Sequence, residues 1–223
     1  MVSGRHALLV VKDGRADGKM YEETEKNMEI ACICHKEAVK ARDILADFLK
    51  SFAAVTKYGR TVIYEGEIYY IPCYMLTCQV EETEERYGFL AGALCEDISV
   101  FRLDEKSGIE RAQREVPDGY VLFGEKTAET VREEISRKIR LNKRLRKMFM
   151  RFHIKEVSLL PVYLPEQTFY VKGKSTDLFL VDDFLRKVDF KNAGAVGRRF
   201  VENCRGQGAC GFCAQARAEE ICR

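Results

Sequence analysis

Four cysteines near the end of the chain are the residues best suited to chemistry. The 223-residue sequence contains nine cysteines, and four of these lie in the last twenty residues. Two form the C-x-x-C pair Cys210-Gly211-Phe212-Cys213, whose spacing lets both thiolates bind one ion at about 2.3 Å. Tetrahedral sulfur coordination suits either Zn²⁺ or an iron–sulfur cluster. The sequence therefore predicts a metal site formed by Cys204, Cys210, Cys213 and Cys222.

Three other interpretations of these cysteines remain open. They are free thiols, a disulfide, or a dithiol redox pair at Cys210 and Cys213. A redox pair of the thioredoxin type opens a helix after a strand, whereas this pair lies near the chain end. The apolar run from Ala7 to Val11 is too short for a secretion signal, and an odd cysteine count without such a signal favours reduced thiols. The expected location is therefore the cytoplasm.

A run of positive charge between residues 132 and 151 is the second candidate site. Ile135, Leu145 and Met148 recur at helical spacing between the cations, which predicts one amphipathic helix from Thr127 or Thr130 to about Phe152. A basic helix face attracts phosphate backbones, with an affinity that falls with salt. The predicted nucleic-acid-binding residues are Arg137, Arg140, Lys143, Arg144, Lys147 and Arg151.

The same cations have three alternative explanations. They suit an acidic protein partner, or the anionic surface of a membrane. They are also compatible with a solvated helix whose charges pair with acids such as Glu133, Glu134 or the acidic loop at 81–85. The overall balance of 37 basic and 35 acidic residues does not distinguish these partners.

Two pairs of adjacent acids end predicted strands, at Glu96-Asp97 and Asp182-Asp183. Carboxylates brought together can bind Mg²⁺ for phosphoryl chemistry, which makes a metal-dependent nuclease an alternative function. Acids at strand ends also form turns by hydrogen bonding to their own backbone. No Lys or His stands at a diagnostic spacing from either pair.

The elements that position these residues are predicted from hydrophobic periodicity. One long helix is expected from about Glu22 to Ala53, because apolar residues recur there at three- and four-residue steps. A hairpin is expected next, with strands at 61–64 and 67–71 joined by Glu65-Gly66. Pro72 extends the second strand and predicts an edge position or a bulge, since proline cannot donate a ladder hydrogen bond. Further strands are expected at 87–94 and 98–103, and a short helix at 195–203.

The segment around Pro161-Val162-Tyr163 is similar to Pro72-Cys73-Tyr74, because each is an apolar strand that carries Pro-x-Tyr. We therefore predict an α+β fold in which two related units, each a helix with an antiparallel hairpin, occupy residues 1–192. Residues 193–223 are expected to form a short helix and a cysteine-rich tail that binds metal. Patterning alone also accounts for the similarity of the two hairpins.

These observations favour a cytoplasmic, non-catalytic binding or adaptor protein. Its basic helix would contact nucleic acid or an acidic protein, and its tail would hold Zn or an iron–sulfur cluster. An iron–sulfur or dithiol redox protein and a metal-dependent nuclease are the alternatives. A content of 46% hydrophobic residues suffices for a packed core, and no run approaches the roughly 18 apolar residues of a membrane span. The oligomeric state is not predicted.

Overall fold

The computed structural model describes residues 26–35, 40–103, 109–124 and 126–207 of the chain. The strands in these ranges are β1 (Asn27–His35), β2 (Val62–Val80), β3 (Arg86–Gly92), β4 (Ile98–Leu103), β5 (Ile109–Pro117), β6 (Ile154–Lys172), β7 (Thr176–Asp182) and β8 (Lys187–Val188). The helices are α1 (Ala41–Leu49), α2 (Phe52–Tyr58), the 3-10 turn η2 (Asp118–Tyr120), α3 (Ala128–Leu141), α4 (Lys143–Arg151) and α5 (Ala193–Gln207). None of the described helices is long and apolar enough to cross a membrane. The α+β class is confirmed.

Two strands of 19 residues, β2 and β6, form the frame of the molecule. They pair antiparallel along almost their whole length, from Val62 opposite Lys172 to Val80 opposite Ile154. The sheet order is β4-β3-β2-β6-β1-β5, with β7 paired to β6 and β8 to β7. Valine, isoleucine and tyrosine are frequent in β2, and these residues fit a pleated and partly buried surface.

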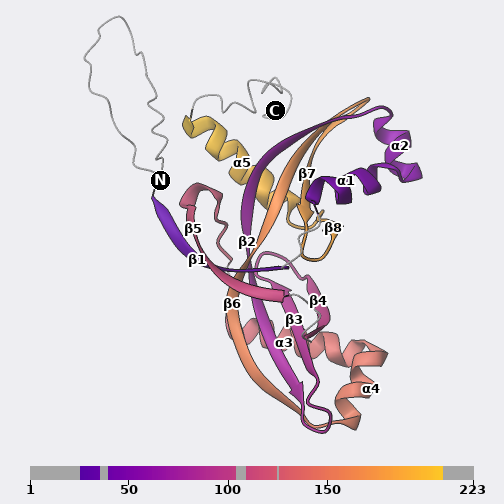
Figure 1. The fold of residues 1–223 in the computed structure, drawn as a ribbon, viewed down its shortest axis with the longest axis vertical. Helices are drawn as coiled ribbons and strands as arrows, with labels where there is room; N and C mark the ends of the chain where they lie inside the picture. The colour runs from indigo at the N-terminus through magenta and orange to yellow at the C-terminus, as the bar shows by residue number, and fades with distance from the viewer. Residues whose placement is uncertain (1–25, 36–39, 104–108, 125, 208–223) are drawn as a thin grey trace, which may run out of the picture.

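The two helix pairs lie at opposite ends of this frame (Figure 1). At one end α1 and α2 cover Phe169 and Val171 of β6, and at the other end α3 and α4 cover Leu76 of β2 and Phe89 of β3. Side chains alternate between faces along a strand. Leu159 packs in the α3–α4 cluster and is ten residues from Phe169, so both helix pairs cover the same face of β6.

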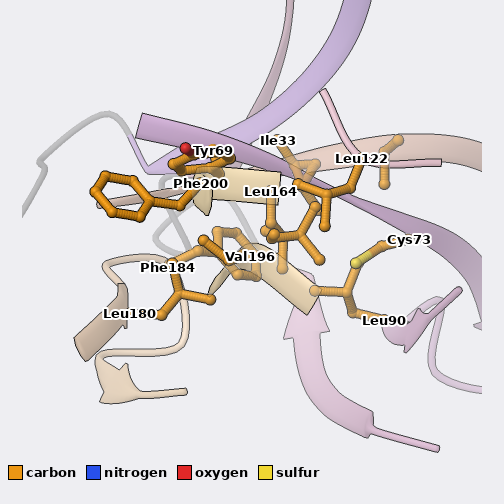
Figure 2. Close-up of a cluster of buried hydrophobic side chains, with 12 residues drawn as sticks. Ile33, Tyr69, Cys73, Leu90, Leu122, Leu164, Leu180, Phe184, Val196 and Phe200 are labelled. Atoms are coloured by element: carbon orange, nitrogen blue, oxygen red, sulfur yellow. The ribbon is translucent and has the colours of Figure 1, made fainter. Parts of the chain in front are cut away.

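The opposite face of the sheet is covered at its centre by α5 (Figure 2). Val196 and Phe200 of α5 pack against Leu164 of β6 and Ile71 of β2, and Ile33 of β1 belongs to the same buried cluster. All five of these side chains are at most 5% exposed. Hydrophobic residues of the helix and of three strands are therefore joined in one core region.

The predicted long helix over Glu22–Ala53 is wrong, because residues Asn27–His35 form strand β1 and the helices begin at Ala41. Ile30, Cys32 and Ile33 are all buried, since β1 contacts apolar residues on both of its faces. A nearly continuous apolar run fits a period of 2 as well as one of 3.6, so periodicity could not separate strand from helix.

The predicted hairpin at Glu65-Gly66 is also wrong, because β2 continues through it. The register with β6 shifts between Glu65 and Ile68, so the glycine marks a β-bulge instead of a chain reversal. Of the two alternatives predicted from Pro72, the edge position is wrong, because β2 lies between β3 and β6, whereas the strand does carry a bulge. Proline is tolerated at this position because the ladder between β2 and β3 stops at Cys73, one residue away. The Pro72 carbonyl still accepts a hydrogen bond from the Ala93 amide at 2.9 Å.

The predicted helix from Thr127 to Phe152 exists but is divided at Asn142. The Thr127 hydroxyl accepts a hydrogen bond from the Thr130 amide and caps α3, as expected. Asn142 then leaves the helical conformation, and its side-chain oxygen accepts hydrogen bonds from the amides of Arg144 and Leu145 at 3.0 and 3.1 Å. Because asparagine is a strong N-cap, it starts a second helix with a new direction.

Each 19-residue strand follows a pair of helices and precedes a seven-residue strand. The order α1-α2-β2-β3 in the first half matches the order α3-α4-β6-β7 in the second half. The Pro-x-Tyr segments lie opposite each other at the centre of the frame, with Pro72 opposite Tyr163 and Tyr74 opposite Pro161. The strands predicted at 87–94 and 98–103 correspond to β3 and β4, and the helix predicted at 195–203 lies within α5.

Candidate functional site

The six predicted nucleic-acid-binding residues all have exposed side chains on the α3–α4 helix pair. Arg137 and Arg140 belong to α3, whereas the other four belong to α4. Leu145 and Phe149 turn the apolar side of α4 toward β3, where the Phe149 ring lies 6.0 Å from the ring of Phe89. The cations therefore occupy the sides of α4 that this packing leaves to solvent.

Ion pairing removes only a small part of the charge on this helix pair. Arg132 pairs with Glu156 at 2.8 Å, and Arg137 pairs with Glu96 at 2.9 Å. The remaining cations of α3 and α4 form no ion pair within the described part of the chain. We call these residues the basic surface: Lys138, Arg140, Lys143, Arg144, Arg146, Lys147 and Arg151.

The position of these cations on α4 works against helix stability. Lys143 and Arg144 occupy the first turn, which contains no acidic residue. The amino-terminal end of a helix already carries partial positive charge, so cations there are unfavourable for the helix and raise the local positive potential. This arrangement is well suited to binding a polyanion and is unnecessary for folding.

The acids of the two pairs that could bind magnesium in the nuclease alternative do not lie together, because their side chains have different partners. Glu96 turns toward Arg137, whereas Asp97 accepts hydrogen bonds from Lys187 and Lys191 at 2.7 and 2.8 Å. Burial opposes the ionisation of Asp97, but the two lysines prevail and lower the pKa of its carboxyl. Among the described residues, no three His, Cys, Asp or Glu side chains are grouped closely enough to hold a metal ion.

Asp182 pairs in register with Lys187 of β8 and, on its other side, faces an acidic residue that the sequence did not single out. Its register partner across β6 and β7 is Glu166, and the two side chains are 1% and 0% exposed. Burial, reinforced by the charge of Asp182, raises the pKa of Glu166 well above its usual range. Burial also raises the pKa of Asp182 to about 6. The available signal was the position of Glu166, which shares the core-facing parity of Leu164 on β6.

The predicted metal ligands fall almost entirely outside the described residues. The backbone of Cys204 belongs to the last turns of α5, and Cys210, Cys213 and Cys222 lie beyond residue 207. The metal site therefore stays a prediction.

The five cysteines within the described ranges are free thiols. Burial raises the pKa of Cys32 and that of Cys78 to about 11 and raises the pKa of Cys73 well above its usual range. The thiols of Cys32, Cys73 and Cys78 are therefore protonated and poor nucleophiles near neutral pH.

A cavity of about 220 Å³ lies beside α2 and β7, between Tyr58, Asp177 and Phe190. Lys57 and Tyr58 both donate hydrogen bonds to Asp177 at its mouth, at 2.6 and 2.5 Å. This volume is below the range of about 300–1,000 Å³ that is typical of small-molecule sites. We therefore take the basic surface as the candidate site. No protein-family model, curated protein or solved structure matches this chain, so the case for the basic surface rests on its own geometry.

Proposed function

We propose that this protein is a non-catalytic binding protein that contacts the phosphate backbone of nucleic acid through the basic surface. The observation that carries the proposal is the set of seven exposed cations on α3 and α4 that have no acidic partner among the described residues. Like charges held this close raise the free energy of the folded protein, and a polyanion relieves that repulsion while releasing its own counterions.

A nucleic acid fits this surface better than the magnesium-nuclease alternative fits the acid pairs. Among the acids of that alternative, Asp97 is neutralised by lysines, Glu96 is paired with Arg137, and Asp182 is buried. An anionic membrane and an acidic protein are the competing partners for the basic surface. The membrane is favoured by the apolar side chains of Leu141 and Met150 beside this surface, which are both 80% exposed. These partners are separated by the experiment below.

The test compares two triple charge reversals with the same change in net charge. One replaces Lys143, Arg144 and Lys147 with Glu on α4. The control replaces the exposed residues Arg60, Lys172 and Lys174 with Glu near α2, at the opposite end of the β2–β6 frame. Binding to fluorescent single-stranded and duplex oligonucleotides is measured by anisotropy as a function of salt, after circular dichroism has confirmed folding.

We expect the α4 reversal to weaken binding at low salt at least about tenfold and to reduce the slope of log K against log salt by about 2 to 3. The control reversal should retain most of the slope. Equal losses in both variants would show a general charge effect and contradict the proposal. Binding to anionic vesicles or polyglutamate, without binding to either oligonucleotide, would assign the surface to a membrane or an acidic protein instead.

We also propose that the carboxyl-terminal cysteines bind one metal centre that orders the tail. Their spacing supports this proposal, as does the location of Cys204 on α5, a helix anchored in the core by Val196 and Phe200. Four thiolates suit Zn²⁺ or an iron–sulfur cluster, and a dithiol redox pair is the alternative. Elemental analysis of anaerobically purified full-length protein separates zinc, iron with labile sulfide, and no metal.

An internal duplication is the third element of the proposal. The matching orders α1-α2-β2-β3 and α3-α4-β6-β7 support it, as does the facing arrangement of the two Pro-x-Tyr segments at the centre of the frame. In this arrangement each helix pair packs on the carboxyl-terminal part of the long strand from the other half. One half would then have kept a neutral surface, and the other would have acquired the basic surface.

A further inference from the structure

Two carboxyl groups face each other inside the molecule where β6 meets β7. Glu166 and Asp182 are directly opposite in the antiparallel register, and their side chains are 0% and 1% exposed. Opposite residues of an antiparallel pair point to the same face, with Cβ atoms about 4.5–5.5 Å apart. The two groups are therefore neighbours in a region that excludes water.

Three of their four oxygens have no hydrogen-bond donor. Asp182 Oδ1 accepts a hydrogen bond from the Leu185 amide at 2.8 Å, but Asp182 Oδ2 and both Oε atoms of Glu166 have no partner among the described residues. Asp189, a buried acid in the same region, is different. Its Oδ1 accepts from the amides of Lys191 and Asn192, and its Oδ2 accepts from the Asn192 side chain at 2.8 Å.

The charges around the pair do not compensate for the missing donors. Asp183 and Asp189 both act against a second negative charge at this place, and the two carboxyl groups in turn raise the pKa of the Cys73 thiol from β2. Lys187 is the neighbouring cation, but its Nζ is already bonded to Asp97 Oδ2 at 2.7 Å. Two ionised carboxylates here would be a buried pair of like charges without solvation, which proteins avoid by binding a proton.

We propose that Glu166 and Asp182 share one proton at neutral pH, with the hydroxyl of protonated Glu166 donating a hydrogen bond to Oδ2 of ionised Asp182. The proton is taken up from solvent when the chain folds, and no covalent bond other than this O–H bond forms or breaks. Glu166 is assigned the proton because both of its oxygens lack donors, whereas Asp182 is stabilised as an anion by the Leu185 amide. The positive charge of Lys187, although bonded to Asp97, also favours the anionic form of Asp182.

The shared proton stabilises the segment from Asp182 to Asn192, which leads into α5. From Asp182 the chain turns through Leu185 into β8, and it then reaches Asp189, whose side chain bonds Lys191 and Asn192. The Asn192 carbonyl accepts the first hydrogen bonds of α5, from the amides of Ala195 and Val196. Loss of the shared proton places two negative charges at the start of this segment, so the seating of α5 becomes sensitive to pH.

The direction of the pH effect follows from the raised pKa values. A group with a higher pKa in the folded state stabilises the fold fully at pH values below its unfolded pKa, about 4 for a carboxyl, and that stability is lost as the pH rises through the folded value. For Asp182 the loss is centred at about pH 6, and the pKa of Glu166, raised first by burial, extends the loss to higher pH.

The test measures unfolding of the full chain by denaturant between pH 5 and pH 9. The substitution Glu166→Gln keeps the shape, removes the charge and provides an amide that donates to Asp182 Oδ2. Asp182→Asn donates in the opposite direction and is the second variant. Glu67→Gln, an exposed position on β2, is the matched control. Side-chain carboxyl ¹³C shifts of the wild-type protein report the titration directly and do not depend on any variant folding.

We expect the unfolding equilibrium constant of the wild-type protein to rise relative to that of Glu166→Gln by a factor on the order of 10 to 100 between pH 5 and pH 9. The Glu67→Gln control should follow the wild type at every pH. A wild-type ratio that stays constant with pH, or a Glu166 carboxyl that is fully ionised at pH 7 in the NMR titration, would overturn the proposal. A rise in melting temperature with millimolar Mg²⁺, Ca²⁺ or Mn²⁺ at pH 8 that Glu166→Gln abolishes would also overturn it, by showing a cation at these oxygens.

Discussion

The two ends of the β2–β6 frame have the same architecture but different surfaces. At each end two short helices cover the sheet with a fully buried aliphatic residue, Leu45 on α1 and Ile135 on α3. The cations of the first helix pair, Arg42 and Lys57, each form an ion pair, as does Lys50 between the two helices. On α3 and α4, only two of nine cations do so within the described residues. Unpaired charge is therefore not a requirement of this architecture, which is why we assign it to binding.

The largest expected effect tests the similarity of the two cores. Leu45→Ala and Ile135→Ala should each lower the free energy of unfolding by about 2–5 kcal/mol, because each leaves a cavity under a helix pair. Leu141→Ala, at an exposed position of α3, should change it by less than about 0.5 kcal/mol. Denaturant unfolding followed by far-UV circular dichroism measures all three. If one core variant produces a separate early transition, the two ends unfold independently and the shared frame does not couple them.

A smaller effect is expected at the end of the molecule that carries α1 and α2, where the cations form ion pairs. Burial opposes the ionisation of Asp177, but hydrogen bonds from Lys57 and Tyr58 prevail and lower the pKa of its carboxyl. A lowered pKa stabilises the fold above the unfolded value of about 4, and this contribution is lost as the pH falls through the folded value. Asp177→Asn should therefore destabilise the protein by about 1 kcal/mol at pH 7 and by less at pH 3.5. A difference from the wild type that grows toward acid pH would contradict this assignment.

The smallest effect concerns the unpaired end. Glu96→Gln removes the partner of Arg137, and the pair is largely exposed, so the free energy of unfolding should change by less than about 0.5 kcal/mol. The freed Arg137 extends the basic surface, and the slope of log K against log salt for oligonucleotide binding should become steeper by up to about 1. An unchanged slope would show that Arg137 lies outside the contact.

The comparison also shows which features were accessible to sequence reasoning. The basic surface was predicted because its charges and its apolar stripe lie on one continuous segment, and only the break at Asn142 was missed. Strand β1 was missed because apolar residues bury both of its faces and because its pairing partners, β5 and β6, lie far away in sequence. The Glu166–Asp182 pair depends on a register between two strands, and no local pattern specifies which residues a register brings together. For the same reason, no local pattern indicated that Asp97 forms an ion pair with Lys187 instead of belonging to a metal site.

The exchange of helix pairs between the two halves has a consequence for synthesis on the ribosome. Leu45 and Tyr58 pack against Phe169, Phe179 and Val181, so the buried strand residues that cover the first helices are synthesised more than a hundred residues later. During translation these helices depend on chaperones or on transient contacts to stay clear of other nascent chains. The core around α1 and α2 is therefore complete only after β6 and β7 have been synthesised.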